Sequence, residues 1–586
     1  MMDSQTPHPD SSELTNVMQD GLHGGGASSR DDTDTELQRN ISRIERLQVE
    51  ERRDALPSPM ATLLPELLST IFVIYARDDF ALANLRWTKL LFVCRHWYDV
   101  GMSTPELWSS IDLSDDRDRD GNVTRTLRRV LIQRTRAGKW PLTVKIGMLQ
   151  GRESNKQATL ISALWDPLTL YSLTVGSNRW YTEKVSEKLE AHPHTTLRHL
   201  TMRSHKQTNP SSIPDIVLGV HTPQLRHLSV DCMAFNFNSI QGLRSLHASF
   251  KQGFSITFEL SDILDALVQC PLLEHLQLIM PGSFRPEAAP AARYAALSHL
   301  ASVTLRGTDE FCSNMLRALR DLPCTTSIAT SNLRKAWDAN LSAPPSSLSY
   351  FKDHASRADA PAIRVLGLVR EPRGFAAQLF QSGLTGDLEP RLCITGPQWG
   401  ETGRPRARPY LCAVATFDTV SSQINALQTI LQYWPISQVT HLDVRTSAPI
   451  DADVWRVLFA TLPTVTTVMI RPESPAATTL FEVLDEHLRD RGGCVIESIM
   501  LDLTWTGAHT RTEVSTGPRA VMFVRGILGH ALAYCAEAMR ANVPLETMEV
   551  VNDKRNYLDS VDCNEFSKDL GRGFVYRGTL YSTARE

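Results

Sequence analysis

One apolar pattern recurs along most of this chain, and it constrains the fold more than any other feature. Six segments between residues 170 and 305 have the order apolar-x-x-apolar-x-apolar, and their first residues lie 27, 28, 18, 30 and 27 positions apart. A unit of this length can hold one strand and one helix, and it buries its apolar side only by stacking against the next unit. The pattern returns in five segments between 363 and 550. The triplets are Leu170/Leu173/Val175, Leu197/Leu200/Met202, Leu225/Leu228/Val230, Leu243/Leu246/Ala248, Leu273/Leu276/Leu278, Leu300/Val303/Leu305, Ile363/Leu366/Leu368, Val439/Leu442/Val444, Val465/Val468/Ile470, Ile496/Ile499/Leu501 and Leu545/Met548/Val550.

The segments between these triplets carry helix signals. Ser261-Asp262 and Asp451 are helix-capping residues, and apolar residues at helical spacing follow both. A strand, a helix and another strand at this rhythm predict a parallel sheet. The pattern resembles leucine-rich repeats in a degenerate form, because the usual Asn or Cys ladder position is missing. The resemblance implies an irregular α/β solenoid over 140–555, and gaps of 63 and 76 residues between triplets make 306–435 its irregular part.

Strand alternation predicts that one face of this sheet is polar. If the apolar triplets point into the core, the residues between them line the other, concave side. A mixed polar surface of this kind can bind a protein or peptide through hydrogen bonds and charge pairs. The residues that we expect to face such a substrate are His199, Arg203, His227, Asp231, His247, His275, Gln277, Arg306, His441, Asp443 and Arg445.

Histidine recurs at one position of the predicted repeats, in His199, His227, His275 and His441. Histidine titrates near neutral pH and is a common metal ligand, so a metal site or a pH switch is one interpretation. Only the first two belong to consecutive repeats, and no Cys or acidic residue shares the position, so we expect polar surface residues instead. The ten cysteines are scattered and form no C-x-x-C pair. We therefore predict no metal and no cofactor.

A second dense apolar block lies near the start of the chain, at 58–113. Pro65 and Glu66 suit the first turn of a helix, where proline's missing donor is not needed and a carboxylate meets the positive end of the helix dipole. Apolar residues follow at helical spacing, and again from Trp87 to Trp97, before a Pro-Glu-Leu-Trp segment begins a third element. The block predicts a small all-helical module.

Three short motifs follow one another in this block. They are LLPELLSTIF, VCRHW and TPELWSSI. Together they resemble the F-box, in the F-box-like form common in fungal chains. The resemblance implies that the helices dock on a Skp-family adaptor, and through it on a cullin, while the repeat region holds an unknown protein substrate. Some of the motif residues must also fill the module's own core. The residues that the resemblance assigns to docking are Leu64, Pro65, Leu67, Leu68, Ile71, Phe72, Leu91, Val93, Cys94 and Trp97.

The functional prediction is a non-catalytic substrate-recognition adaptor of an SCF-type E3 ubiquitin ligase. The chain has no Walker-type phosphate loop, no H-E-x-x-H, no G-x-S-x-G elbow and no G-x-G-x-x-G after a predicted strand. Two alternatives stay open. One is a repeat scaffold that binds proteins without ligase activity, and the other is an enzyme carried in the irregular region at 306–435.

Composition divides the rest of the chain. Residues 1–35 predict a disordered tail, 36–57 an amphipathic helix, 114–139 a linker and the start of the next domain, and 556–586 a C-terminal tail. The 61 basic and 65 acidic residues give a net charge of −4, which offers no reason to expect nucleic-acid or membrane binding. No apolar run is long enough to span a bilayer, so we expect an intracellular protein, cytoplasmic or nuclear.

Overall fold

The computed structural model describes most of the chain between residues 63 and 551. The described residues are 63–78, 81–113, 123–147, 154–165, 169–177, 179–204, 221–233, 236–250, 258–282, 284, 293–332, 346–371, 374–381, 411–415, 420–434, 436–444, 450–470, 475–491, 496–502 and parts of 529–551. The segments predicted as tails and as an amphipathic helix, together with Arg445, lie outside them. The chain forms two compact units. Unit 1 contains Met1–Asp112 and Arg128–Leu142, and unit 2 contains Leu113–Leu127 and Thr143–Glu586.

Unit 1 is mainly helical. Its elements are α2 (Pro65–Asp78), α3 (Ala81–Asn84), the 3₁₀ segment η2 (Arg86–Phe92), α4 (Arg95–Ser103), the 3₁₀ segment η3 (Pro105–Trp108), β1 (Ser110–Asp112) and most of α5 (Val123–Ala137). The second predicted helix is broken into η2 and α4, because Cys94 has extended backbone angles of φ −162° and ψ 170°. Much of the segment 114–139, where we predicted a linker and the start of the next domain, is the helix α5.

The core of unit 1 is built from tryptophans and from one side of α2. Leu68, Phe72 and Trp87 are each 0% exposed. Trp87 and Trp108 meet edge to face with ring centroids 4.9 Å apart, a favourable geometry for aromatic pairs. The guanidinium of Arg136 lies 4.2 Å from the centre of the Trp108 ring. This cation–π contact attaches α5 to the core.

One large sheet runs through unit 2. In spatial order its strands are β2 (Leu142–Ile146), β3 (Leu170–Ser177), β4 (His199–Ser204), β5 (His227–Asp231), β6 (Ser245–Ser249), β7 (His275–Ile279), β9 (Ser302–Gly307), β11 (Ser327–Asn332), β14 (Leu411–Ala415), β13 (Gly374–Gln381), β12 (Ile363–Glu371), β15 (His441–Val444), β16 (Thr467–Ile470), β17 (Ser498–Asp502) and β18 (Thr547–Val551). The short strands β8 (Ala295–Ala296) and β10 (Leu319–Arg320) pair separately. Every predicted apolar triplet overlaps a strand, and the fold is α/β with a large, mostly parallel sheet.

The irregular region at 306–435 departs from the predicted parallel order. β13 pairs antiparallel with β12 and β14, and β12 then pairs parallel with β15. Glu371 lies opposite Gly374, so β12 and β13 are joined by two residues. Antiparallel neighbours accept so short a connection, whereas parallel strands need a crossover of about a dozen residues or more. The sheet nevertheless continues through the region, because β11 pairs with both β9 and β14.

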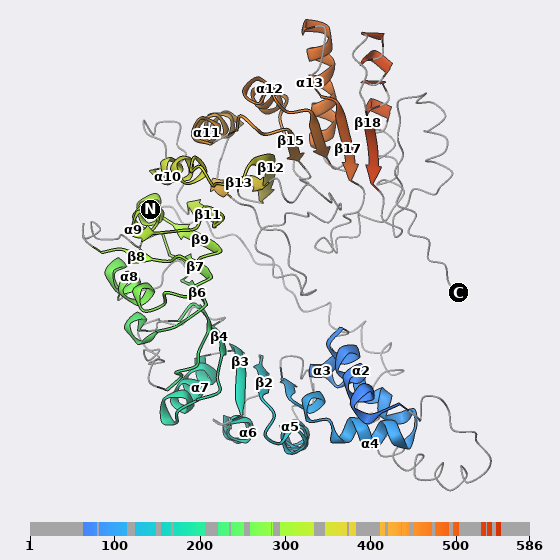
Figure 1. Ribbon diagram of the computed structural model, residues 1–586, viewed down its shortest axis with the longest axis vertical. Helices are drawn as coiled ribbons and strands as arrows, with labels where there is room; N and C mark the ends of the chain where they lie inside the picture. Colours follow the sequence, from blue (N-terminus) through green and yellow to red (C-terminus); the bar gives the residue numbers. More distant parts are fainter. Residues whose placement is uncertain are drawn as a thin grey trace, which may run out of the picture. The chain divides into compact units, whose positions relative to one another are not determined.

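Helices lie along one face of this sheet (Figure 1). They are α6 (Ser154–Leu164), α7 (Arg179–Ala191), α8 (Leu260–Val268), α9 (Asp309–Ala318), α10 (Ser346–Ala355), α11 (Val420–Tyr433), α12 (Ala452–Thr461) and α13 (Pro475–Arg491). The short 3₁₀ segment η5 (Phe237–Ser239) contacts α8. Asp451 caps α12 as predicted, since its carboxylate accepts a hydrogen bond from Asp453 N at 3.0 Å. α8 is capped by Glu259, so that Ser261 and Asp262 lie inside its first turn.

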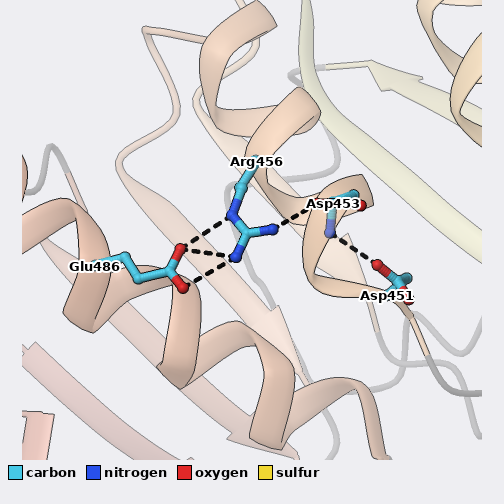
Figure 2. A network of polar contacts seen from close by, with 4 residues as sticks. All are labelled: Asp451, Asp453, Arg456 and Glu486. Carbon is cyan, nitrogen blue, oxygen red and sulfur yellow. Dashed lines mark hydrogen bonds and ion pairs between the residues drawn. The ribbon is translucent and has the colours of Figure 1, made fainter.

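An ion-pair network joins two of these neighbouring helices. Arg456 of α12 donates from Nε and Nη2 to the carboxylate of Glu486 in α13, at 3.0 and 2.9 Å, and donates from Nη1 to Asp453 (Figure 2). The side chains of all three are 45–62% exposed. Exposed ion pairs add little stability, so the network mainly sets how α12 lies against α13.

Candidate functional site

An exposed apolar stripe runs along α2 of unit 1. Leu64, Leu67, Ile71 and Ile74 are 62%, 53%, 48% and 53% exposed. Their spacing of three, four and three residues places them on one side of a helix. Burying a single side chain of this size stabilises a complex by about 1.5–3 kcal/mol, so the apolar stripe is a strong candidate for a protein contact.

The opposite side of α2 faces the core of unit 1. Leu68, Phe72 and Ala76 are fully buried, and Phe72 meets the Trp97 ring at a centroid distance of 5.1 Å. The sequence pattern LLPELLSTIF therefore contains two interleaved sets of apolar residues. One set holds the unit together, and the other reaches solvent.

The remaining residues assigned to docking divide in the same way. Pro65, Val93 and Cys94 are exposed, whereas Leu91 is buried and Trp97 is half-buried. Val93 and Cys94 directly precede α4, and His96 in the first turn of α4 lies 3.1 Å from Leu63 O through its Nε2. That contact brings the start of α4 to the start of α2, where the apolar stripe begins. Phe92, 38% exposed, adds an apolar side chain that the motif comparison did not assign to docking.

Unit 2 presents a polar face on the side of its sheet opposite the helices. In β5, β6 and β7, buried residues alternate with half-buried ones, and the buried residues belong to the apolar triplets. The parallel register aligns the residues between the buried triplet positions in rows across the strands, and in β9 this set includes buried Ser302 and exposed Arg306. The polar face consists of the first row Ser172, His199, His227, Ser245, His275 and Ser302, the second row Thr174, Thr201, Ser229, His247, Gln277 and Thr304, and the third row Gly176, Arg203, Asp231, Ser249, Ile279 and Arg306.

Histidines of consecutive repeats meet on this polar face. The rings of His199 and His227 stack at 4.3 Å with an interplanar angle of 2°, and the Tyr171 ring lies 5.2 Å from His199. Other histidines bind hydroxyl groups. His247 Nδ1 lies 3.3 Å from Ser229 Oγ. In the first row and in β15, His275 Nδ1 lies 3.0 Å from Ser302 Oγ, and His441 Nδ1 lies 2.8 Å from Thr440 Oγ1.

Three of these histidines, His199, His227 and His247, are poor proton acceptors. Partial burial lowers the pKa of His199, His227 and His247 below the ordinary value, because burial disfavours the charged imidazolium. His227 and Arg198 lower the pKa of His199 further by charge repulsion. At neutral pH the rings are therefore uncharged hydrogen-bonding groups. Within the described ranges, no group of three or more His, Cys, Asp and Glu side chains is placed to hold a metal ion.

Asp443 does not lie where we expected it. It is 4% exposed, although the alternation predicted that it faces a substrate. The aligned residues of β16 and β17 are Met469 and Met500, which are 2% and 9% exposed. The sheet is thus buried on both faces at these strands, and two large apolar residues beside Asp443 fit a covered surface. Arg306 is exposed on β9, and that it faces a substrate stays a prediction.

Sequence reasoning missed a row of arginines at the edge of the polar face. Arg226 N donates to Arg198 O at 2.9 Å, and Arg244 N donates to Arg226 O at 2.7 Å. The three residues are therefore direct neighbours, each one position before the first residue of β4, β5 or β6. We call Arg198, Arg226 and Arg244 the arginine row. Its signal in the sequence is an arginine directly after the first leucine of three consecutive triplets, in LRHL, LRHL and LRSL.

No family model and no curated protein matches the chain. Among solved structures, the chain is similar to one described as "Crystal structure of Rad7 and Elc1 complex in yeast". The match has a TM-score of 0.30 and 13% sequence identity, and it covers 76% of this chain and 94% of the other.

Among the residues that the structure describes, no helix combines the length and the apolar character needed to cross a membrane.

Proposed function

We propose that this chain is a substrate-recognition adaptor of an SCF-type E3 ubiquitin ligase. Unit 1 is the F-box-like module that docks on a Skp-family adaptor, which binds a cullin in turn. Unit 2, as a degenerate leucine-rich-repeat-like solenoid, holds the protein substrate on its polar face. The chain itself performs no chemistry.

The observation that carries the proposal is the division of the F-box-like motif between core and solvent. A motif that served only as a bundle core would bury all its apolar residues. Leu67 and Ile71 instead remain about half exposed beside Leu68 and Phe72, which are fully buried. A monomeric protein rarely leaves such a row of large apolar side chains in water unless a partner covers it.

The mechanism that follows is proximity. A substrate held on unit 2 while unit 1 is bound to the ligase has its lysines confined near a ubiquitin-charged enzyme. Confinement converts a bimolecular encounter into an intramolecular one, which raises the effective concentration of the target lysine without a catalytic group on this chain.

Co-purification with a Skp-family adaptor tests the proposal. Leu67→Asp with Ile71→Asp puts two charges into the docking surface without touching the core, so we expect adaptor binding to fall about a hundredfold or more. Leu68 is not suitable for this test, because its side chain is fully buried.

A matched control exists in unit 2. Val268, the last residue of α8, and Leu272, four residues beyond it, are 51% and 50% exposed. Val268→Asp with Leu272→Asp makes the same chemical change away from the apolar stripe. The control should bind the adaptor as the unaltered chain does. Equal binding by the Leu67/Ile71 variant, with its fold intact by circular dichroism, would favour the alternative of a repeat scaffold without ligase activity.

A further inference from the structure

We propose that the polar face of unit 2 binds an extended, acidic protein segment, which the arginine row holds through its side-chain carboxylates. This inference rests on the proposed function, because it names the class of substrate that the recognition unit would take. It concerns β3 to β9, where the three rows of the polar face are aligned by backbone pairing.

The arginine row places like charges side by side. The backbones of neighbouring strands lie about 4.8 Å apart, so the row gathers three positive charges at one edge of the polar face. Glu274 is paired with the charge of Arg244, whereas the structure shows no carboxylate paired with Arg198 or Arg226 among the described residues. Such a row favours a ligand of opposite charge.

The hydrogen-bonding capacity of the arginine row is mostly unused. Arg198 lies over the Tyr171 ring at 5.9 Å, Arg226 donates from Nη1 to Gly242 O at 2.9 Å, and Arg244 donates from Nη1 to Glu274 at 3.2 Å. A guanidinium carries five N–H donors. In the described part of the chain, each of the three arginines thus keeps donors that can form the two parallel bonds that carboxylates accept.

The charge of the polar face is opposite to that of the whole chain. The rows of β3 to β9 and their edge contain the arginines 198, 203, 226, 244 and 306 and, among described residues, only two carboxylates, Asp231 and Glu274. Glu274 is already paired with Arg244, and Asp231 accepts a hydrogen bond from Cys232 Sγ at 3.2 Å. A positive face on a chain with a net charge of −4 attracts an acidic segment selectively.

The neutral part of the face favours a peptide over a nucleic acid. Single-stranded nucleic acids bind through bases that stack on open aromatic rings. Here the rings of His199 and His227 already stack on each other, and the Tyr171 ring lies tilted against His199. The second row offers hydroxyl and amide groups, in Thr201, Ser229 and others, which match the backbone of an extended peptide.

Fluorescence anisotropy with the full chain tests the inference. The probe is a fluorescein-labelled peptide of alternating Glu and Ser, compared with a Gln-Ser peptide of the same length. We expect the chain to bind the Glu-Ser peptide in a salt-sensitive manner. The triple variant Arg198→Gln, Arg226→Gln, Arg244→Gln should weaken binding about tenfold or more.

The control is Arg293→Gln, because Arg293 is an exposed arginine of unit 2 that pairs with Asp265 of α8. It should change binding less than about twofold. Arg198→Gln alone guards against misfolding of the triple variant, since Arg198 is exposed and its guanidinium lies over the Tyr171 ring without a side-chain hydrogen bond to the described residues. It should weaken binding measurably. Equal binding by the triple variant and the control would overturn the inference. Tighter binding of a single-stranded DNA of equal charge, lost in the triple variant, would overturn it too.

The test is independent of the ligase proposal. The Leu67→Asp, Ile71→Asp variant should keep full peptide binding, because its changes lie in unit 1. Peptide binding without any adaptor binding would reject the proposed function alone. Adaptor binding without any Glu-Ser binding would reject only this inference.

Discussion

Gly101 shows how tightly unit 1 is packed at a single residue. A Cβ at this position of α4 would lie 2.3 Å from Leu91 Cδ2 and 3.5 Å from the rings of Phe72 and Trp87. Leu91 is itself 6% exposed and has little room to move. Glycine here permits the close approach of η2 to α4.

Gly101→Ala should therefore destabilise unit 1 by about 1–2 kcal/mol, because the overpacking penalty exceeds the gain in helix propensity. Hydrogen exchange of the α4 amides measures this change locally. Leu91→Ala makes room for the added methyl group, so the double variant should be more stable than the sum of the single changes predicts. Simple additivity would show that the contact with Leu91 is not the cause.

His354 of α10 is a titrating residue in the core of unit 2. Its side chain is 1% exposed, its Nε2 lies 3.3 Å from Thr326 O, and burial together with nearby Arg357 lowers its pKa to about 4. The unfolded chain, with an ordinary histidine pKa near 6.5, binds more protons between these two values. The stability that neutral His354 provides is complete above about pH 6.5 and is lost as the pH falls towards 4.

His354→Asn should flatten this pH dependence of the free energy of unfolding, which amounts to up to about 3 kcal/mol. Denaturant unfolding of the chain at a series of pH values measures it. An unchanged slope in the His354 variant would place the acid sensitivity elsewhere.

At the scale of elements, the N-terminus of α12 gives a direct test of a predicted cap. Asp451 accepts a hydrogen bond from Asp453 N, which satisfies one of the donors that a helix leaves open at its start. Asp451→Ala should cost about 1 kcal/mol and increase exchange of the first-turn amides about fivefold, while Asp451→Asn should retain most of the protection. If Asn and Ala behave alike, the cap does not stabilise α12.

The sequence predicted the elements of unit 2 where its repeat is regular. Triplets such as Leu197/Leu200/Met202 mark strands because the same three positions must be buried in every unit. β13 could not be found in this way. It belongs to an antiparallel hairpin, which needs no crossover helix and so leaves no step of 20 to 30 residues in the sequence.

The candidate surfaces were harder to predict than the strands. Both sides of α2 are apolar, so spacing alone could not separate exposed Leu67 from buried Leu68, and only the packing of unit 1 distinguishes them. Asp443 was misplaced for a related reason. Strand alternation predicts to which face of the sheet a side chain points. Whether other segments of the protein bury that face depends on the tertiary structure, which the alternation does not predict.

At the scale of the whole molecule, the two units carry different kinds of surface. Unit 1 exposes the apolar stripe, which can contribute binding energy by leaving water, whereas unit 2 exposes a polar face whose arginines select by charge. A near-neutral chain can thus carry one surface for a Skp-family adaptor and a different surface for a substrate. The net charge of −4 indicates neither surface.

Calorimetric titration of the full chain with a purified Skp-family adaptor tests the central claim most directly. The account predicts a one-to-one complex with a micromolar or tighter dissociation constant, which is lost in Leu67→Asp, Ile71→Asp and unchanged in both Val268→Asp, Leu272→Asp and the arginine-row triple variant. A chain that binds no Skp-family adaptor, or a Leu67/Ile71 variant that binds as tightly as the unaltered chain, would contradict it.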